Sequence, residues 1–167
     1  MITIQRALKE HVQGIADVCG SGYRNTYAQT HDQEYIERII QEFYNLERLE
    51  SELEPSNSWS GWHVAVDGDR VVGAACGGFI SEEEAELFAL YLDPARKREG
   101  IGTMLLEALT EQQKNMGARL QWVSAAENND MGIPFYLARG FKEQGRIQSY
   151  ANNDNEEYRS IRYRRNV

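Results

Sequence analysis

Apolar residues in the first third of the chain follow a strand period and then a helix period. Ile2 and Ile4 alternate with polar neighbours, which predicts a half-buried strand. A stripe at helical spacing follows, made of Leu8, Val12, Ile15 and Cys19. The Gly-Ser-Gly segment at 20–22 is expected to end that helix. The pattern then predicts a second helix over 33–44 and a third, short helix that Asn45 caps.

The middle of the chain carries strand signals. Apolar residues alternate with others from 62 to 66, and the Asp-Gly-Asp sequence at 67–69 supplies a hairpin turn into a partner strand over 71–76. The two glycines that follow this partner strand mark a bulge or a strand end. A continuous apolar run over 87–92 is typical of a strand that is covered on both faces.

The last third continues with alternating helices and strands. An apolar stripe over 101–116 predicts a helix, and Gly117 stands where a helix of this kind ends. Residues 120–124 have the composition of another strand.

A short helix and a strand pair complete the pattern. Pro134 suits the first position of the helix and Gly140 its end. Strands are predicted over 141–150 and 158–163, joined by a polar turn. The order of elements indicates an α/β (α+β) protein with a single mixed, largely antiparallel central sheet flanked by helices.

Composition and charge limit the class of protein. A chain of 167 residues with 41% hydrophobic and 26% charged residues is typical of one soluble domain, so residues 1–167 are expected to form a single domain. A formal net charge of -8 argues against a dedicated nucleic-acid binder and suits a cationic substrate. No apolar run reaches the roughly 20 residues of a membrane span, and the first residues lack a secretory signal. We therefore expect a cytoplasmic protein that does not bind membranes.

The cysteines and histidines give no sign of a metal centre. Cys19 and Cys76 lie far apart among small or apolar residues and are expected to be buried thiols. His11, His31 and His63 lack the spacing of metal ligands, so we predict no metal.

The segment that follows the apolar run at 87–92 has the chemistry of a pyrophosphate cradle. A cationic loop, 96–98, leads into Gly100 and Gly102 at the expected start of a helix. A helix N-terminus presents free N–H groups, glycines allow close approach of a ligand to the backbone, and cations add charge-assisted contacts. The P-loop sequence is absent, and Leu105 occupies the position where a dinucleotide-binding fingerprint needs a third small residue.

Two motifs resemble those of the GNAT acetyltransferases. Their Q/R-x-x-G-x-G/A signature is matched by residues 97–102, with Lys97 in the first position. Lys keeps the charge but lacks the planar fork of Arg, and Arg96 or Arg98 could compensate. The family's N-x-x-A-x-x-F-Y-x-x-x-G-F pattern is matched by residues 129–141, with Gly132 in place of the alanine. The resemblance spans roughly 62–141, and residues 23–54 resemble the bacterial polyamine acetyltransferases.

The resemblance implies a GNAT fold in which the fourth and fifth strands, 87–92 and 120–124, splay apart and expose backbone groups to the pantetheine arm of acetyl-CoA. It also implies the residues that bind acetyl-CoA, namely Tyr91, Leu92, Lys97, Arg98, Glu99, Gly100, Ile101, Gly102, Thr103, Asn129 and Tyr136. Tyr136 would protonate the leaving thiolate, and the backbone N–H of Leu92 would polarise the thioester carbonyl.

The general base is less clearly marked in the sequence. Related enzymes often place a Glu on the fourth strand, and Phe88 occupies the matching position. Glu86 lies two residues earlier and therefore on the same face, where it would remove the amine proton directly or through water. A solvated carboxylate at the end of a strand explains Glu86 equally well.

The function implied is transfer of an acetyl group from acetyl-CoA to a primary amine, either a small amine or polyamine or a peptide amine. Tyr27, Tyr35, Trp59 and Tyr150 are aromatic candidates for the walls of the amine site. A non-catalytic acyl-CoA sensor and an interaction domain that docks a basic partner through the Glu-rich helix at 46–54 are the alternatives. The family also suggests a homodimer formed through the last strand pair.

Overall fold

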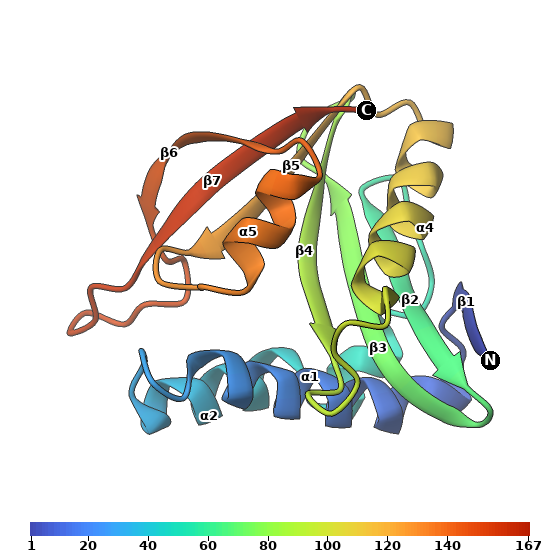
Figure 1. The fold of residues 1–167 in the computed structure, drawn as a ribbon, viewed down its shortest axis with the longest axis horizontal. Coiled ribbons are helices and arrows are strands. Elements are labelled where there is room, and N and C mark those ends of the chain that lie inside the picture. The colour runs from blue at the N-terminus through green and yellow to red at the C-terminus, as the bar shows by residue number, and fades with distance from the viewer.

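The computed structural model describes residues 1–167 and contains one seven-stranded sheet in the order β1-β2-β3-β4-β5-β7-β6 (Figure 1). Its strands are β1 (Ile2–Arg6), β2 (Trp59–Asp67), β3 (Arg70–Phe79), β4 (Glu84–Leu92), β5 (Leu120–Ala126), β6 (Lys142–Gln148) and β7 (Arg159–Asn166). Only the β4–β5 pair is parallel, which confirms the mixed, largely antiparallel sheet.

Helices cover both faces of the sheet. They are α1 (Val12–Tyr27), α2 (Gln33–Phe43), α3 (Leu46–Ser51), α4 (Ile101–Asn115) and α5 (Gly132–Ala138), and a 3-10 turn, η1 (Lys9–His11), precedes α1. Alternate residues of the strands point to opposite faces of the sheet and belong to two separate hydrophobic cores. Ala65 and Ala75 pack beneath α4, while Val64 and Ala74 pack beneath α1. No helix combines the length and the hydropathy that crossing a bilayer requires.

The first helix differs from the prediction at both ends. Leu8 is half exposed and lies outside α1, because η1 separates it from the helix. The helix also continues through Gly20 and Gly22 instead of ending there. At Gly22 an added Cβ would lie 3.0 Å from the Cβ of Tyr91, so the missing side chain lets α1 approach β4 closely. Packing against the sheet therefore outweighs the helix-breaking tendency of the glycines.

Several local predictions are confirmed and one is wrong. The side chain of Asn45 accepts a hydrogen bond from the backbone N–H of Arg48 (2.9 Å) and caps α3. A register shift lies between Cys76 and Gly77, where a bulge was one of the two expectations. Pro134 occupies the third position of α5 and not the first, because the helix begins at Gly132. The two cysteines are buried and free.

The parallel strands β4 and β5 diverge after a short paired segment. Glu84–Leu87 pairs with Leu120–Val123, and the remaining residues of both strands have no ladder between them. Two buried amides hold the paired end. Gln113 of α4 donates to the backbone carbonyl of Glu86 (3.1 Å), and Gln121 of β5 donates to Gln113 (2.9 Å). The opening therefore begins from a rigid joint, and Figure 1 shows the two strands separating from it.

Candidate active site

A cavity of about 210 Å³ occupies the opening between β4 and β5. The outer half of β4, the end of β5, α1 and α5 form its walls. Six of the residues predicted to bind acetyl-CoA line it, namely Tyr91, Leu92, Lys97, Gly102, Asn129 and Tyr136. The sequence predicted that the strand at 87–92 is covered on both faces, and this prediction is wrong for part of the strand. Its outer half borders this opening, and the side chain of Phe88 is half exposed.

The remaining predicted residues lie beside the cavity, at the start of α4. Gly100 is the residue before the first turn and has a φ of 78°, in the left-handed region that favours glycine. A hydrogen bond from the N–H of Met104 to the carbonyl of Gly100 closes the first turn of α4. The N–H groups of 101–103 precede it in the helix, where backbone donors have no intrahelical acceptor. This end of the helix is therefore suited to an anionic group.

The side chains of this loop divide into free and occupied groups. Arg96 forms ion pairs with Asp67 (3.0 Å) and Glu99 (2.7 Å), which removes it as the substitute for Lys97 that the sequence allowed. Glu99 is occupied by the same contact. Lys97 and Arg98 take part in no ion pair, so they are the cations available to a phosphate group.

Three further residues of the loop can contribute only through their backbone. The side chain of Ile101 is buried in the core. The hydroxyl of Thr103 accepts a hydrogen bond from Arg139. An added Cβ on Gly102 would lie 3.3 Å from the ring of Phe135, so this glycine also permits close packing of α4 against α5. The sequence indicates only the first role of Gly102, close approach of a ligand, because packing between helices is not visible in a local motif.

Tyr136 and Asn129 are held on the α5 side of the cavity. The ring of Tyr136 is buried edge-on against Phe135 (5.3 Å) and Phe141 (5.6 Å). Burial, with a smaller contribution from Tyr27, raises the pKa of Tyr136 above its usual value, so its phenol stays protonated at neutral pH.

The side-chain oxygen of Asn129 accepts from the backbone N–H of Gly132 (2.8 Å), which orients the amide. An added Cβ at position 132 would lie only 2.5 Å from the nitrogen of that amide. Gly132, the residue that departs from the family pattern, therefore allows the close approach of Asn129.

A second cavity, of about 620 Å³, adjoins the first. Its walls come from α1, α2, β4, β7 and the connection between β6 and β7. All four predicted aromatic wall residues line it, namely Tyr27, Tyr35, Trp59 and Tyr150. The two cavities share Tyr27, Leu87, Phe88, Ala89, Tyr91 and Ser124. A molecule in one cavity would therefore touch the same β4 residues as a molecule in the other.

Glu86 faces the second cavity, where it is almost fully buried. Its carboxylate accepts a hydrogen bond from Arg162 of β7 (2.7 Å), and Arg162 also donates to the hydroxyl of Ser124 (2.9 Å). The carboxylate is thus a paired group inside a cavity, whereas a solvated strand end was the other interpretation of the sequence.

Three polar residues that no sequence pattern marked as functional, Glu52, Ser124 and Arg162, also line the second cavity. Glu52 was placed within a surface helix, but it ends α3 and accepts a hydrogen bond from the indole of Trp62 (3.1 Å). The pairing of Ser124 with Arg162 across β5 and β7 depends on strand register. No local pattern in the sequence contains that register.

Comparison with known proteins identifies the family. Residues 24–141 match the acetyltransferase (GNAT) family. The chain is 30% identical over 145 residues to spermidine N(1)-acetyltransferase of Thermoplasma acidophilum, which covers 84% of this chain and 88% of that protein. It is 36% identical over 61 residues to ribosomal protein bS18-alanine N-acetyltransferase of Salmonella typhimurium, which covers 36% of this chain and 41% of that protein.

A solved structure supports the same assignment. PaiA N-acetyltransferase of Thermoplasma acidophilum, in complex with coenzyme A, superposes with a TM-score of 0.81 at 25% identity and covers 97% of this chain and 98% of that chain. The chain belongs to the GNAT family of acetyltransferases. It is therefore an N-acetyltransferase of a family that uses acetyl-CoA, and the family and fold suggested by the two sequence motifs are confirmed.

Proposed function

We propose that this protein transfers the acetyl group of acetyl-CoA to a primary amine by direct attack in a ternary complex. The observation that carries the proposal is the junction of the two cavities at β4. The smaller one lies beside the start of α4 and suits the pantetheine arm, and the larger one contains a buried carboxylate and suits an amine. Two substrates in adjoining cavities would meet without a covalent enzyme intermediate.

The residues of the first cavity and its rim fit acetyl-CoA. The pyrophosphate would be held by Lys97, Arg98 and the backbone N–H groups of 99–103. The two side chains are cations without an ion-pair partner, and the N-terminus of α4 has free backbone donors. The backbone at Tyr91 and Leu92 would pair with the pantetheine arm, and the amide of Asn129 would contact its other side. Acetyl-CoA supplies the activated acetyl group as a thioester.

Glu86 and Tyr136 would move the protons of the reaction. An alkylamine, with a pKa near 10, arrives as an ammonium, and Glu86 accepts one proton from it directly or through water. The neutral nitrogen attacks the thioester carbonyl carbon, polarised by the N–H of Leu92, so that a C–N bond forms and the C–S bond breaks. The thiolate takes the proton of Tyr136, and the second amine proton restores the phenol through solvent. The products are an amide, free CoA and one proton.

The relatives support an amine acceptor of more than one kind. One is named for a polyamine, spermidine, and another for the alanine of a ribosomal protein. The net charge of -8 is compatible with either cationic acceptor. A cytoplasmic location and a homodimer stay predictions from the sequence.

The experiment that tests the proposal measures CoA thiol release from acetyl-CoA in the presence of pooled amines, with acetyl-CoA binding measured on the same preparation. We expect turnover in at least one pool of polyamines, other small amines or short peptides. Turnover should fall with Glu86→Gln while acetyl-CoA binding is unchanged, because Glu86 faces only the second cavity. Binding of acetyl-CoA without turnover in any pool would count against acetyl transfer to an amine.

A further inference from the structure

The second cavity has a largely hydrophobic lining that is rich in aromatic residues. Tyr23 and Tyr35 come from α1 and α2, Trp59 and Phe88 from β2 and β4, and Tyr150 from the connection between β6 and β7. Phe88 is half exposed and lies almost parallel to Trp59, with ring centroids 6.2 Å apart. Apolar surface of this kind, open to solvent within a cavity of about 620 Å³, favours a ligand with its own apolar group.

The charged side chains of the cavity are paired with one another. Glu52 accepts hydrogen bonds at both carboxylate oxygens, one from Arg48 (3.1 Å) and one from Trp62 (3.1 Å). Glu86, which also lines the cavity, accepts from Arg162 at one oxygen, Oε2, and its other oxygen, Oε1, accepts no hydrogen bond from a side chain. Two Glu and two Arg side chains line the cavity, so their formal charges cancel. The cavity therefore offers one carboxylate oxygen, enough for a single ammonium group, and any further cation would be desolvated without a partner.

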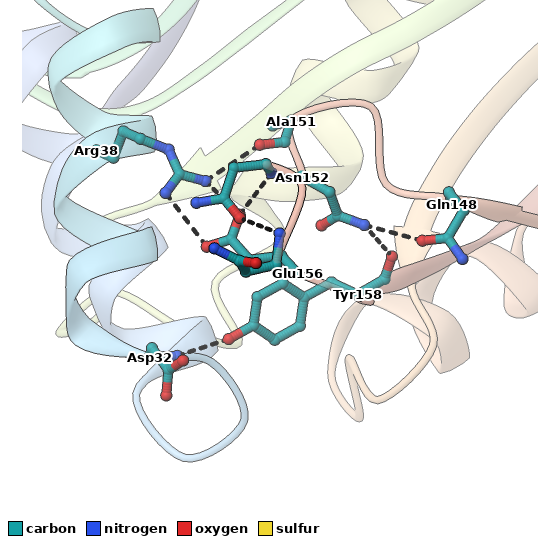
Figure 2. Close-up of polar contacts among 9 residues, drawn as sticks. Asp32, Arg38, Gln148, Ala151, Asn152, Glu156 and Tyr158 are labelled. Atoms are coloured by element: carbon teal, nitrogen blue, oxygen red, sulfur yellow. Dashed lines mark hydrogen bonds and ion pairs between the residues drawn. The ribbon is translucent and has the colours of Figure 1, made fainter.

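The connection between β6 and β7, residues 149–158, is fastened to α2 beside the cavity. Figure 2 shows Arg38 of α2 reaching across to Glu156 and to the carbonyl of Ala151, to both of which its guanidinium donates hydrogen bonds. The hydroxyl of Tyr158 accepts from the backbone N–H of Asp32 (3.0 Å), so the same connection is also tied to the start of α2. These contacts hold the connection in place beside the cavity, whose volume of about 620 Å³ is in the range of small-molecule sites.

Tyr150 lies in this fastened connection, at the edge of the cavity. Its ring meets Phe43 of α2 edge-on at 5.7 Å, yet 84% of the residue is exposed. An exposed aromatic residue held over an apolar cavity is available to pack against a ligand, and its replacement should affect folding little.

We propose that the acceptor is a primary monoamine carrying an aromatic ring on a short linker, the ammonium bound at Glu86 and the ring packed among Phe88, Trp59 and Tyr150. This inference rests on the proposed amine acetylation and narrows it. It differs from the polyamine acceptor that the name of one relative suggests. The ring would bury against the aromatic walls, while the nitrogen would lie beside the β4 residues that both cavities share.

A matched series of acceptors tests the inference. n-Butylamine and 1,4-diaminobutane differ only by a second amino group, and 2-phenylethylamine adds a ring to a short monoamine. We expect kcat/KM to be about 10- to 100-fold higher for 2-phenylethylamine than for n-butylamine, because a ring leaves water. We expect 1,4-diaminobutane to be about 10-fold slower than n-butylamine, because its second ammonium finds no free carboxylate.

Variants locate the ring. Tyr150→Ala should raise the KM for 2-phenylethylamine about 5-fold with little change in kcat, while the conservative Tyr150→Phe should keep the original value. Phe88→Glu should reverse the preference between n-butylamine and 1,4-diaminobutane, because it adds a carboxylate and removes a ring. A uniform loss for all three amines in both variants would indicate a structural effect and count against the assignment.

The outcomes separate this inference from the proposed function. Turnover in which 1,4-diaminobutane, spermidine or an alanyl peptide exceeds 2-phenylethylamine in kcat/KM would confirm amine acetylation and overturn the aromatic acceptor. Binding of 2-phenylethylamine to the protein–CoA complex, measured by calorimetry and lost in Tyr150→Ala, but with no turnover, would support the aromatic site and contradict acetyl transfer. Absence of both binding and turnover would overturn the inference.

Discussion

Replacement of Tyr136 by Phe removes one hydroxyl from the wall of the smaller cavity and leaves the ring in place. The ring contacts with Phe135 and Phe141 are kept by the substitution, so the free energy of unfolding should change by no more than about 1 kcal/mol. Acetyl-CoA affinity should also change little. A loss of activity in this variant therefore reports on the phenolic proton and not on a change in the fold or in acetyl-CoA binding.

The expected loss follows from the role of that proton. Burial raises the pKa of Tyr136, so the hydroxyl is a proton donor throughout the neutral range, and no other group is proposed to protonate the thiolate. Removal of a general acid lowers kcat by about 10²- to 10⁴-fold, or about 3 to 5 kcal/mol in activation free energy. The loss should appear in kcat and kcat/KM together, because the proton is needed only in the transition state.

Thiol release with acetyl-CoA and the amine both at saturating concentration gives kcat, and calorimetry gives the affinity for acetyl-CoA. Tyr27→Phe is the matched control, because Tyr27 also lines the first cavity and burial raises its pKa to about 12. We expect its effect to stay below about 10-fold. An unchanged kcat in Tyr136→Phe would refute the general acid, and a larger loss in Tyr27→Phe would transfer the role to Tyr27.

Three further predictions concern binding and stability. Gly102→Val should abolish acetyl-CoA binding, because the new side chain meets the ring of Phe135 and crowds the start of α4. The control variant Gly145→Val, at a glycine with open space around it, should bind acetyl-CoA normally in the same titration. Gln113→Leu should lower the free energy of unfolding in urea by about 2 to 4 kcal/mol, since the Glu86 carbonyl loses the amide that donates to it and the Gln121 amide keeps only its hydrogen bond to Thr110. The exposed Gln13→Leu should change it by less than about 0.5 kcal/mol. Equal unfolding midpoints for the two variants would refute the role of the amide pair. Burial raises the pKa values of Cys76 and Tyr91 in the folded protein above their ordinary values of 9.0 and 10.0. The contribution of these two groups to stability is therefore complete when the pH is below the ordinary values, and it is lost as the pH rises towards the folded-state pKa values. Urea titrations should therefore show a falling free energy of unfolding above pH 9.0, and a flat profile there would contradict the shifts.

Local sequence was sufficient for the features that depend on adjacent residues. The Asn45 cap, the start of a helix after Gly100 and the glycine that ends α4 all lie within a few residues of the bonds they control. The same holds for the loop at 97–103, whose free N–H groups follow from a helix that starts there. Contiguous sequence patterns therefore identified residues that gather at the first cavity and at the start of α4, where we propose that acetyl-CoA binds.

Tertiary packing decided what local patterns could not. The glycines of α1 predicted the end of a helix, but contact with β4 carries the helix past them, because burial against the sheet outweighs local propensity. Arg96 was indistinguishable in the sequence from Lys97 and Arg98, and only the folded chain brings Asp67 to it.

The second cavity, where we propose that the amine binds, is the clearest case. The sequence determined the family, the sheet and the loop beside α4, because these are written in contiguous motifs. The pairing of Glu86 with Arg162, 76 residues away, and the neutral aromatic cavity around them arise only when distant elements meet. The physical reason is that charge pairing and burial depend on distance in space, and strand register and helix docking set that distance.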